Sequence, residues 1–234
     1  MRTVYAIFFW AACLFAANHV QAHALWIETA PVGKSGKAHQ VRIYYGEPAE
    51  GILEKVGDWW SDVGSFTLVL QLPDGSSQQL TATAAADHYT ATLTPAVEGL
   101  YTLSIVKPVK ETFDGHKYQF NSTAFVKVGK AAVTTATGAS EDFRVFAEAF
   151  DTAALGKPVT VNARLNGQPL KELEITVFSP NGWSKTFHSD ENGVISFVPD
   201  RKGHYLVEAV YSADVEGQDF KHLHRISTWS LTIN

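Results

Sequence analysis

Cysteine is almost absent from this chain of 234 residues, because Cys13 is the only one. It lies in an apolar segment near the start of the sequence, so the remainder has no disulfide, no thiolate nucleophile and no thiolate ligand for zinc. Positive charge is also sparse. The net charge is −5 and no basic cluster stands out, so nucleic acid is not an expected partner. The protein must therefore be held together by hydrophobic cores.

Long apolar runs and catalytic motifs are missing as well. After residue 22 no apolar run approaches the roughly 18 residues that cross a bilayer, so the mature chain is not expected to span a membrane. There is no Gly-x-Ser-x-Gly elbow, no phosphate-binding Gly-x-x-x-x-Gly-Lys loop and no His-Glu-x-x-His pair. The sequence predicts a protein that is not an enzyme and carries no organic cofactor.

The first residues have the pattern of a secretory leader. Arg2 precedes an apolar run over residues 4–17, and Val20-x-Ala22 places small residues at the two positions that signal peptidase reads. Residues 1–22 are therefore predicted to be a cleaved signal peptide. Cleavage there would make His23 the first residue of a periplasmic protein.

Two other interpretations of the leader stay open. Cleavage after Ala24 also satisfies the small-residue rule and would remove His23. Cys13 would carry a lipid if the segment were a lipoprotein signal, although Trp10 fits that signal poorly.

Downstream, apolar and polar residues alternate in short runs that end at turn residues, as is typical of β-strands. The predicted strands are residues 41–45, 65–72, 88–93, 100–106, 120–128, 143–149, 159–165, 173–178, 183–187, 194–197, 205–211 and 224–233. Asn166-Gly167 and Asn192-Gly193 are hairpin turn signals. The fold class is therefore predicted to be all-β.

Two motifs recur in both halves of the chain. Pro73-Asp74-Gly75 matches Pro180-Asn181-Gly182, and Pro95-x-x-x-Gly99-x-Tyr101 matches Pro199-x-x-x-Gly203-x-Tyr205. A tyrosine at this place can brace the corner of a Greek-key sandwich through its hydroxyl. The repeat predicts two tandem immunoglobulin-like β-sandwich domains, residues 23–129 and 141–234, joined by a linker over residues 130–140.

Histidines are the candidate metal ligands. An N-terminal His23 would offer its α-amine and ring Nδ1 to one ion, and nickel, cobalt and copper favour such nitrogen donors. His222 and His224 would share one face of an extended strand. His116 follows Phe113-Asp114-Gly115, which has the composition of a hairpin tip. A solvated polar edge is the alternative interpretation of these histidines.

An acidic stretch surrounds two adjacent tryptophans. Its carboxylates are Glu47, Glu50, Glu54, Asp58 and Asp62, and the tryptophans are Trp59 and Trp60. Such a stretch can attract cations or a basic partner, and a solvated loop is the alternative. The two tryptophans are also candidates for core or interface anchors.

Several strings are familiar from one protein family. They are His23-Ala-Leu-Trp-Ile-Glu28, Val41-Arg-Ile-Tyr-Tyr-Gly-Glu47, Phe178-Ser-Pro-Asn-Gly-Trp-Ser-Lys-Thr-Phe187, Gly193-Val-Ile-Ser-Phe197 and Gly203-His-Tyr-Leu-Val-Glu208. The chain resembles a family of exported bacterial proteins of unknown function that are commonly labelled periplasmic components of cobalt or nickel uptake. Its second half is similar to the carboxypeptidase-regulatory type of sandwich.

The resemblance implies a secreted, β-rich protein that handles cobalt or nickel. Together with the nitrogen donors of the histidines it favours a periplasmic protein that binds nickel, cobalt or copper and buffers the ion or delivers it to a membrane transporter. A non-catalytic interaction or scaffold protein without metal is the first alternative. A copper oxidoreductase with an N-terminal histidine brace is the second.

Overall fold

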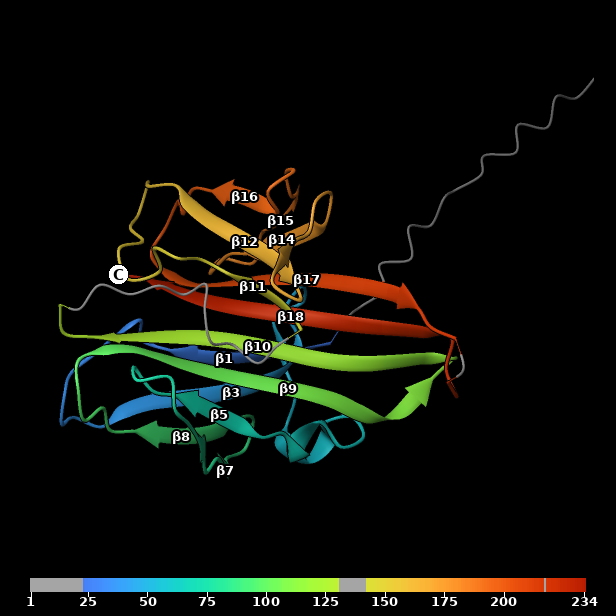
Figure 1. Ribbon diagram of the computed structural model, residues 1–234, viewed down its shortest axis with the longest axis horizontal. Coiled ribbons are helices and arrows are strands. Elements are labelled where there is room, and N and C mark those ends of the chain that lie inside the picture. The colour runs from blue at the N-terminus through green and yellow to red at the C-terminus, as the bar shows by residue number, and fades with distance from the viewer. Residues whose placement is uncertain (1–22, 131–141, 217) are drawn as a thin grey trace, which may run out of the picture.

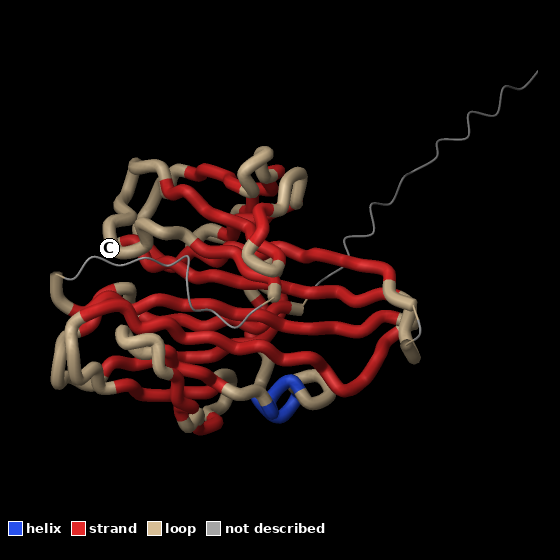
Figure 2. The backbone as a smooth tube through the Cα atoms, viewed as in Figure 1, coloured by secondary structure: helices blue, strands red, loops and turns tan. Residues whose placement is uncertain are grey.

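A computed structural model describes residues 23–130, 142–216 and 218–234. The predicted signal peptide and all of the predicted linker except Lys130 lie outside these residues. The described chain is all-β, as predicted (Figure 2), and its helical segments are two single 3₁₀ turns, Val56–Asp58 and Val63–Ser65. No helix in the described ranges is long and apolar enough to cross a membrane.

The strands form a large central sheet with a smaller sheet on each of its faces (Figure 1). The central sheet has the order β15-β14-β17-β18-β10-β9-β5-β6, and β2 pairs with β10. Its strands are β2 (Val32–Gly33), β5 (Leu68–Gln71), β6 (Ser77–Leu80), β9 (Gly99–Phe113), β10 (His116–Val128), β14 (Glu174–Phe178), β15 (Ser184–His188), β17 (Gly203–Asp214) and β18 (His222–Ile233).

The two flanking sheets come from different halves of the chain. The first has the order β1-β3-β8-β7 with β4 paired to β3, and the other has the order β11-β12-β13 with β16 paired to β12. Their strands are β1 (Ala24–Thr29), β3 (His39–Glu47), β4 (Ile52–Leu53), β7 (Thr83–Ala84), β8 (Tyr89–Leu93), β11 (Phe143–Phe146), β12 (Val159–Leu165), β13 (Gln168–Pro169) and β16 (Val194–Phe197).

Alternation along the central strands builds two separate cores. On β10, Phe120 and Ala124 pack into the core under the first flanking sheet, whereas Phe125 packs into the core under the other. On β18, Ile226 packs into the first of these cores and Trp229 into the second. Successive strand residues point to opposite faces, so one sheet serves both cores.

The two halves meet along a parallel strand pair. β10 and β18 are hydrogen-bonded in parallel from His116↔His222 to Thr123↔Trp229. On each side of this seam the strands follow in equivalent order, β9-β5-β6 on one side and β17-β14-β15 on the other. The order of equivalent strands is therefore the same in both directions from the seam, and we call this a palindromic sheet. The flanking sheets of the two halves cover opposite faces of it.

Buried hydroxyl and amide side chains line the seam. Asn121, Ser122, Thr123, Ser227 and Thr228 are all 0% exposed. The backbone N–H of Ile27 on β1 donates to Ser122 Oγ at 3.0 Å, and that of Val145 on β11 donates to Ser227 Oγ at 3.0 Å. Each flanking sheet is thus tied to the seam by an equivalent bond, which satisfies backbone groups that water cannot reach.

The corner predicted from the repeated motif is confirmed in both halves. The hydroxyl of Tyr101 donates to the Val97 carbonyl at 2.9 Å, and that of Tyr205 donates to the Arg201 carbonyl at 3.0 Å. Gly99 lies against Pro73 with φ +140°, and Gly203 lies against Pro180 with φ +130°. The repeated prolines and glycines therefore form matching contacts, which explains their common spacing.

Replacing Gly99 by alanine is expected to destabilise the protein by about 2 kcal/mol, because a Cβ needs a strained φ and would lie 2.6 Å from Pro73 Cβ. The matched control is Gly75→Ala, where φ is +84° but nothing lies within 4 Å of the new Cβ. That change should cost only about 1 kcal/mol. Urea denaturation of both variants measures the difference, and equal costs would show that the contact with Pro73 is unimportant.

Two pairs of central strands are longer than the sequence indicates. The strand predicted to end at Val106 continues as β9 to Phe113, past Pro108, and a register shift between Lys117 and Gln119 of β10 lies opposite this proline. Proline is tolerated in strands at such irregularities. In Figure 1, β9, β10, β17 and β18 project beyond the flanking sheets at one end. The candidate site lies at this end.

Candidate functional site

Three of the four predicted metal ligands come together at the projecting end of the seam. His116 of β10 and His222 of β18 are register partners, and His224 lies two residues further on the same face of β18. The ring of His116 stacks on His222 with centroids 4.7 Å apart and lies 4.5 Å from the ring of His224. His116 Nδ1 and His224 Nε2 are in direct contact. We call these residues the histidine cluster.

Side chains of β17 orient two of these rings. Asp214 and Ser212 are the register partners of His222 and His224. Nδ1 of His222 bonds to Asp214 Oδ1 at 2.7 Å, and Nδ1 of His224 bonds to Ser212 Oγ at 2.7 Å. The carboxylate of Asp214 accepts from Nδ1–H of His222, which leaves Nε2 of that ring as the atom for a metal ion, and Ser212 holds the orientation of the His224 ring.

The surroundings of His224 favour its neutral imidazole form. Burial lowers the pKa of His224 below its ordinary value, and repulsion from His116 and His222 lowers it further. Neutral imidazole is the form that binds metal ions. The rings nevertheless contact each other directly, and within the described ranges no three histidine, cysteine or carboxylate side chains converge on a point where they would hold a metal ion as they stand.

The fourth predicted ligand, His23, has different neighbours. It begins the described chain just before β1, and its Nε2 lies 2.5 Å from Glu54 Oε1 and 3.5 Å from Glu47 Oε1. Its ring stacks on Tyr45 at 5.1 Å. The described structure pairs His23 with these carboxylates rather than with the histidine cluster.

A cavity of about 700 Å³ contains both His23 and His224 in its wall. Its apolar lining is Tyr45, Trp60, Phe113, Tyr118, Phe120, Val210 and Ile226, and its other polar lining is Glu54, Asp58 and Ser212. We call this space the aromatic cavity. Its volume is in the range of small-molecule sites in proteins.

The aromatic cavity is built from segments that are distant in the sequence. The loop with the 3₁₀ turn Val56–Asp58 supplies Asp58 and Trp60, and the projecting strands supply Tyr118 and His224. The indole of Trp60 meets the ring of Tyr118 edge-on at 5.5 Å, and Tyr118 stacks on His224 at 5.4 Å. This chain of rings joins the histidine cluster to the cavity.

Residues of the acidic stretch and its two tryptophans lie partly in the core and partly in the wall of the aromatic cavity. Trp59 is a core residue, 6% exposed, whereas Trp60 lines the cavity. Asp62 accepts a bond from the buried Lys107 at 2.6 Å and one from the Lys110 N–H at 2.8 Å, which fastens the loop to β9. Tyr118, Ser212 and Asp214 were not predicted as site residues. Their one sequence signal is even spacing: Tyr118 lies two residues after His116 on β10, and Ser212 and Asp214 lie two residues apart on β17.

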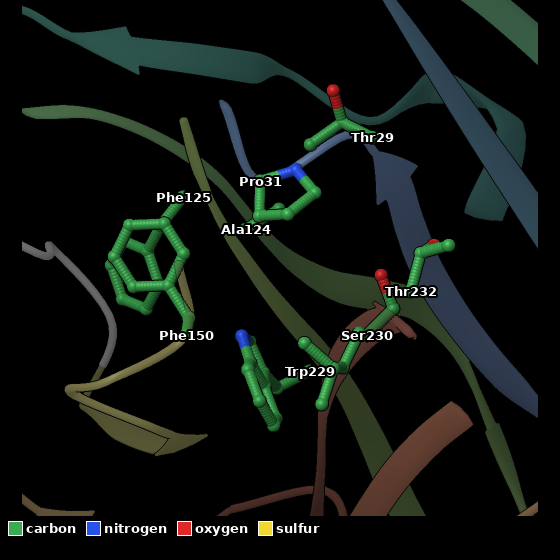
Figure 3. A pocket seen from close by; sticks show the side chains of 9 residues that line it. Thr29, Pro31, Ala124, Phe125, Phe150, Trp229, Ser230 and Thr232 are labelled. Atoms are coloured by element: carbon green, nitrogen blue, oxygen red, sulfur yellow. The ribbon is translucent and has the colours of Figure 1, made fainter. Parts of the chain in front are cut away.

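Two other cavities are much smaller than the aromatic cavity. The crevice beside the seam in Figure 3, between Pro31, Phe125, Phe150 and Trp229, has a volume of about 10 Å³. That is the size of one water molecule. A second hollow, next to Phe66 and Tyr89, has a volume of about 140 Å³.

The chain belongs to the family defined by a domain of unknown function, DUF4198, whose model matches residues 20–213. This confirms the resemblance to a family of unknown function. No curated protein matches the chain. The match begins just before β1 and ends within β17, so it covers the first strand of the seam, His116 and the lining of the aromatic cavity except His224 and Ile226.

Proposed function

We propose that this protein binds a nickel, cobalt or copper ion through His116, His222 and His224. The observation that carries the proposal is the gathering of three imidazoles, from strands about a hundred residues apart, on one face of the seam. Imidazole nitrogen is a donor that these ions favour over the oxygen ligands of calcium or magnesium.

The residues fit such an ion after a small rearrangement. Nδ1 is occupied in His222 and His224, so the donor atoms would be their Nε2 atoms and Nδ1 of His116. Rotation of the His116 ring about its side-chain bonds would open the contact with His224. The carboxylate of Asp214 would then accept from Nδ1–H of His222 and hold its ring, and such partners strengthen metal ligands.

The role that follows is binding and release without catalysis. In this proposal the protein is exported through a cleaved signal peptide of residues 1–22, works in the periplasm, and buffers the ion or delivers it to a membrane uptake system. The two halves are two immunoglobulin-like sandwiches, the second of the carboxypeptidase-regulatory type. The matched tyrosine corners and the two cores support that interpretation.

The His222→Ala and His224→Ala variants should each weaken the binding of nickel and copper tenfold or more, an effect in the range seen when metal-site residues are lost. The control is His188→Ala, because His188 is 63% exposed and lies on β15 away from the cluster. Isothermal titration calorimetry on the mature protein measures the affinity of all three variants.

The affinity for the metal ion should also fall below about pH 6.5, where protons compete for imidazole.

The same titrations separate the alternatives. Unchanged affinity in both cluster variants would contradict the proposal. An N-terminal histidine brace predicts instead that one alanine added before His23 abolishes binding, whereas the cluster predicts no change. A protein that binds none of the three ions would fit the interaction or scaffold role.

A further inference from the structure

We infer that the aromatic cavity binds a small organic cation of the quaternary ammonium class. This site is separate from the proposed metal centre, although His224 borders both. Phe, Tyr and Trp supply five of its twelve lining residues, and its lining includes the carboxylates Glu54 and Asp58. These two features together are the chemistry by which proteins recognise alkylated ammonium groups.

Aromatic faces come from several directions. Tyr45 meets Phe120 edge-on at 5.5 Å on the core side of the cavity, and Trp60 meets Tyr118 edge-on at 5.5 Å on the other. Tyr45 and Phe120 are almost fully buried and form the floor of the cavity, whereas Trp60 and Tyr118 are only partly buried. Trp60 and Tyr118 are therefore the rings that a cation would contact. A ring face attracts a cation through its quadrupole, and tryptophan does so most strongly.

The charged groups in the wall are carboxylates. Glu54 and Asp58 both line the cavity, and no lysine or arginine is among its lining residues in the described chain. Glu54 is shared with His23, so it is partly neutralised when that histidine is protonated. Asp58 is exposed, which places its carboxylate where the cavity meets solvent. An organic anion is disfavoured by this wall.

The size and the rim fit a small organic ligand. The volume of about 700 Å³ far exceeds that of a bare metal ion and suits a compact molecule. Phe113 lines the cavity and is 66% exposed, which is unusual for so large an apolar side chain. A ligand that entered beside Phe113 would cover this apolar surface.

Choline and its neutral analogue 3,3-dimethyl-1-butanol are suitable probes, because they share a shape and differ in charge. Calorimetry is done on the full mature chain with metal removed by a chelator. Choline is expected to bind at least tenfold more tightly than 3,3-dimethyl-1-butanol. Exchange of the cation for a neutral group removes the cation–π attraction and the attraction to Glu54 and Asp58. Equal affinity for the two probes, or no binding of choline, would overturn the inference.

Two variants locate the site. Trp60→Leu should weaken choline binding fivefold or more, and Trp183→Leu, a partly buried tryptophan packed against the other core, should leave it unchanged. Asp58→Asn changes an exposed side chain and so should not disturb folding. It is expected to weaken choline binding about threefold without affecting the neutral probe. Choline affinity that is unchanged in both cavity variants would overturn the placement in this cavity.

Discussion

Replacing Glu208 by glutamine is expected to remove a loss of stability of about 3 kcal/mol that the wild-type protein suffers between pH 4.5 and pH 7. Glu208 lies on β17 between Thr176 and Thr228, and burial raises its pKa from 4.5 to about 7. Its Oε2 atom is buried and has no hydrogen-bond partner within the described residues. A buried carboxyl without a partner is stable only in its neutral form.

The direction of the pH effect follows from which state holds the proton. Below pH 4.5 both the folded and the unfolded protein are protonated at Glu208, and the folded state suffers no penalty. Between pH 4.5 and about 7 the unfolded chain releases the proton while the folded protein keeps it. The free energy of unfolding therefore falls by about 1.4 kcal/mol for each pH unit and levels off above pH 7.

Urea denaturation at pH 5, 6, 7 and 8 tests this directly in both proteins. The difference in free energy of unfolding between Glu208→Gln and wild type should rise over that series and then level off. His204 lies on the same face of β17 and contacts Glu28 at 3.2 Å, and its own titration is largely common to both proteins. A difference that does not change with pH would mean that Glu208 is ionised in the folded state.

Cutting the chain between the two halves is expected to leave them bound to each other as one folded unit. A specific protease site introduced within residues 131–141 would separate the chain after Lys130. Eight residue pairs of β10 and β18 would still hold the fragments together. So would bonds between the halves, such as Thr228 Oγ1 to the Leu25 carbonyl at 2.7 Å and Lys127 Nζ to Asp151 at 2.7 Å.

Size-exclusion chromatography of the cleaved protein checks this expectation. Both fragments should elute together at the volume of the intact chain and separate only in denaturant. Each fragment made alone should fail to form a stable monomer, because its seam strand would be a long edge with unpaired backbone groups. Two independently folded monomers would contradict the expectation and would show that the seam adds little stability.

Several strands of the flanking sheets and the two corners could be predicted because local patterns encode them. The run from Val159 to Leu165 alternates cleanly, and its predicted bounds agree with β12. Asn166-Gly167 adopts the positive φ values, 50° and 79°, that its hairpin signal requires. Tyr101 and Tyr205 carry their own motif, so their hydroxyl bonds were foreseeable.

The seam could not be predicted from the sequence. Asn121-Ser122-Thr123 is polar, and polar residues in a strand ordinarily indicate an exposed face, yet all three are completely buried. Their partners lie about a hundred residues away. No local signal sets the register of a parallel pair between such distant strands.

The same limit applies to the site. The even spacing of His222 and His224 predicted a shared face, and this is confirmed by their common contact with His116. That His116 would join them depends on the register of β10 with β18. That His23 lies apart from the histidine cluster depends on the loop that brings Glu54 to the His23 ring.

The palindromic sheet has the arrangement of an isologous dimer whose two subunits are fused into one chain. Two identical subunits that paired the same edge strand in parallel, around a two-fold axis along the strands, would place their flanking sheets on opposite faces as seen here. In a true dimer any change would appear twice. In a single chain the two halves can differ, so the aromatic cavity can take different residues from each half. His116 and His222 face each other across the seam, at the place where the boundary between the subunits of such a dimer would lie.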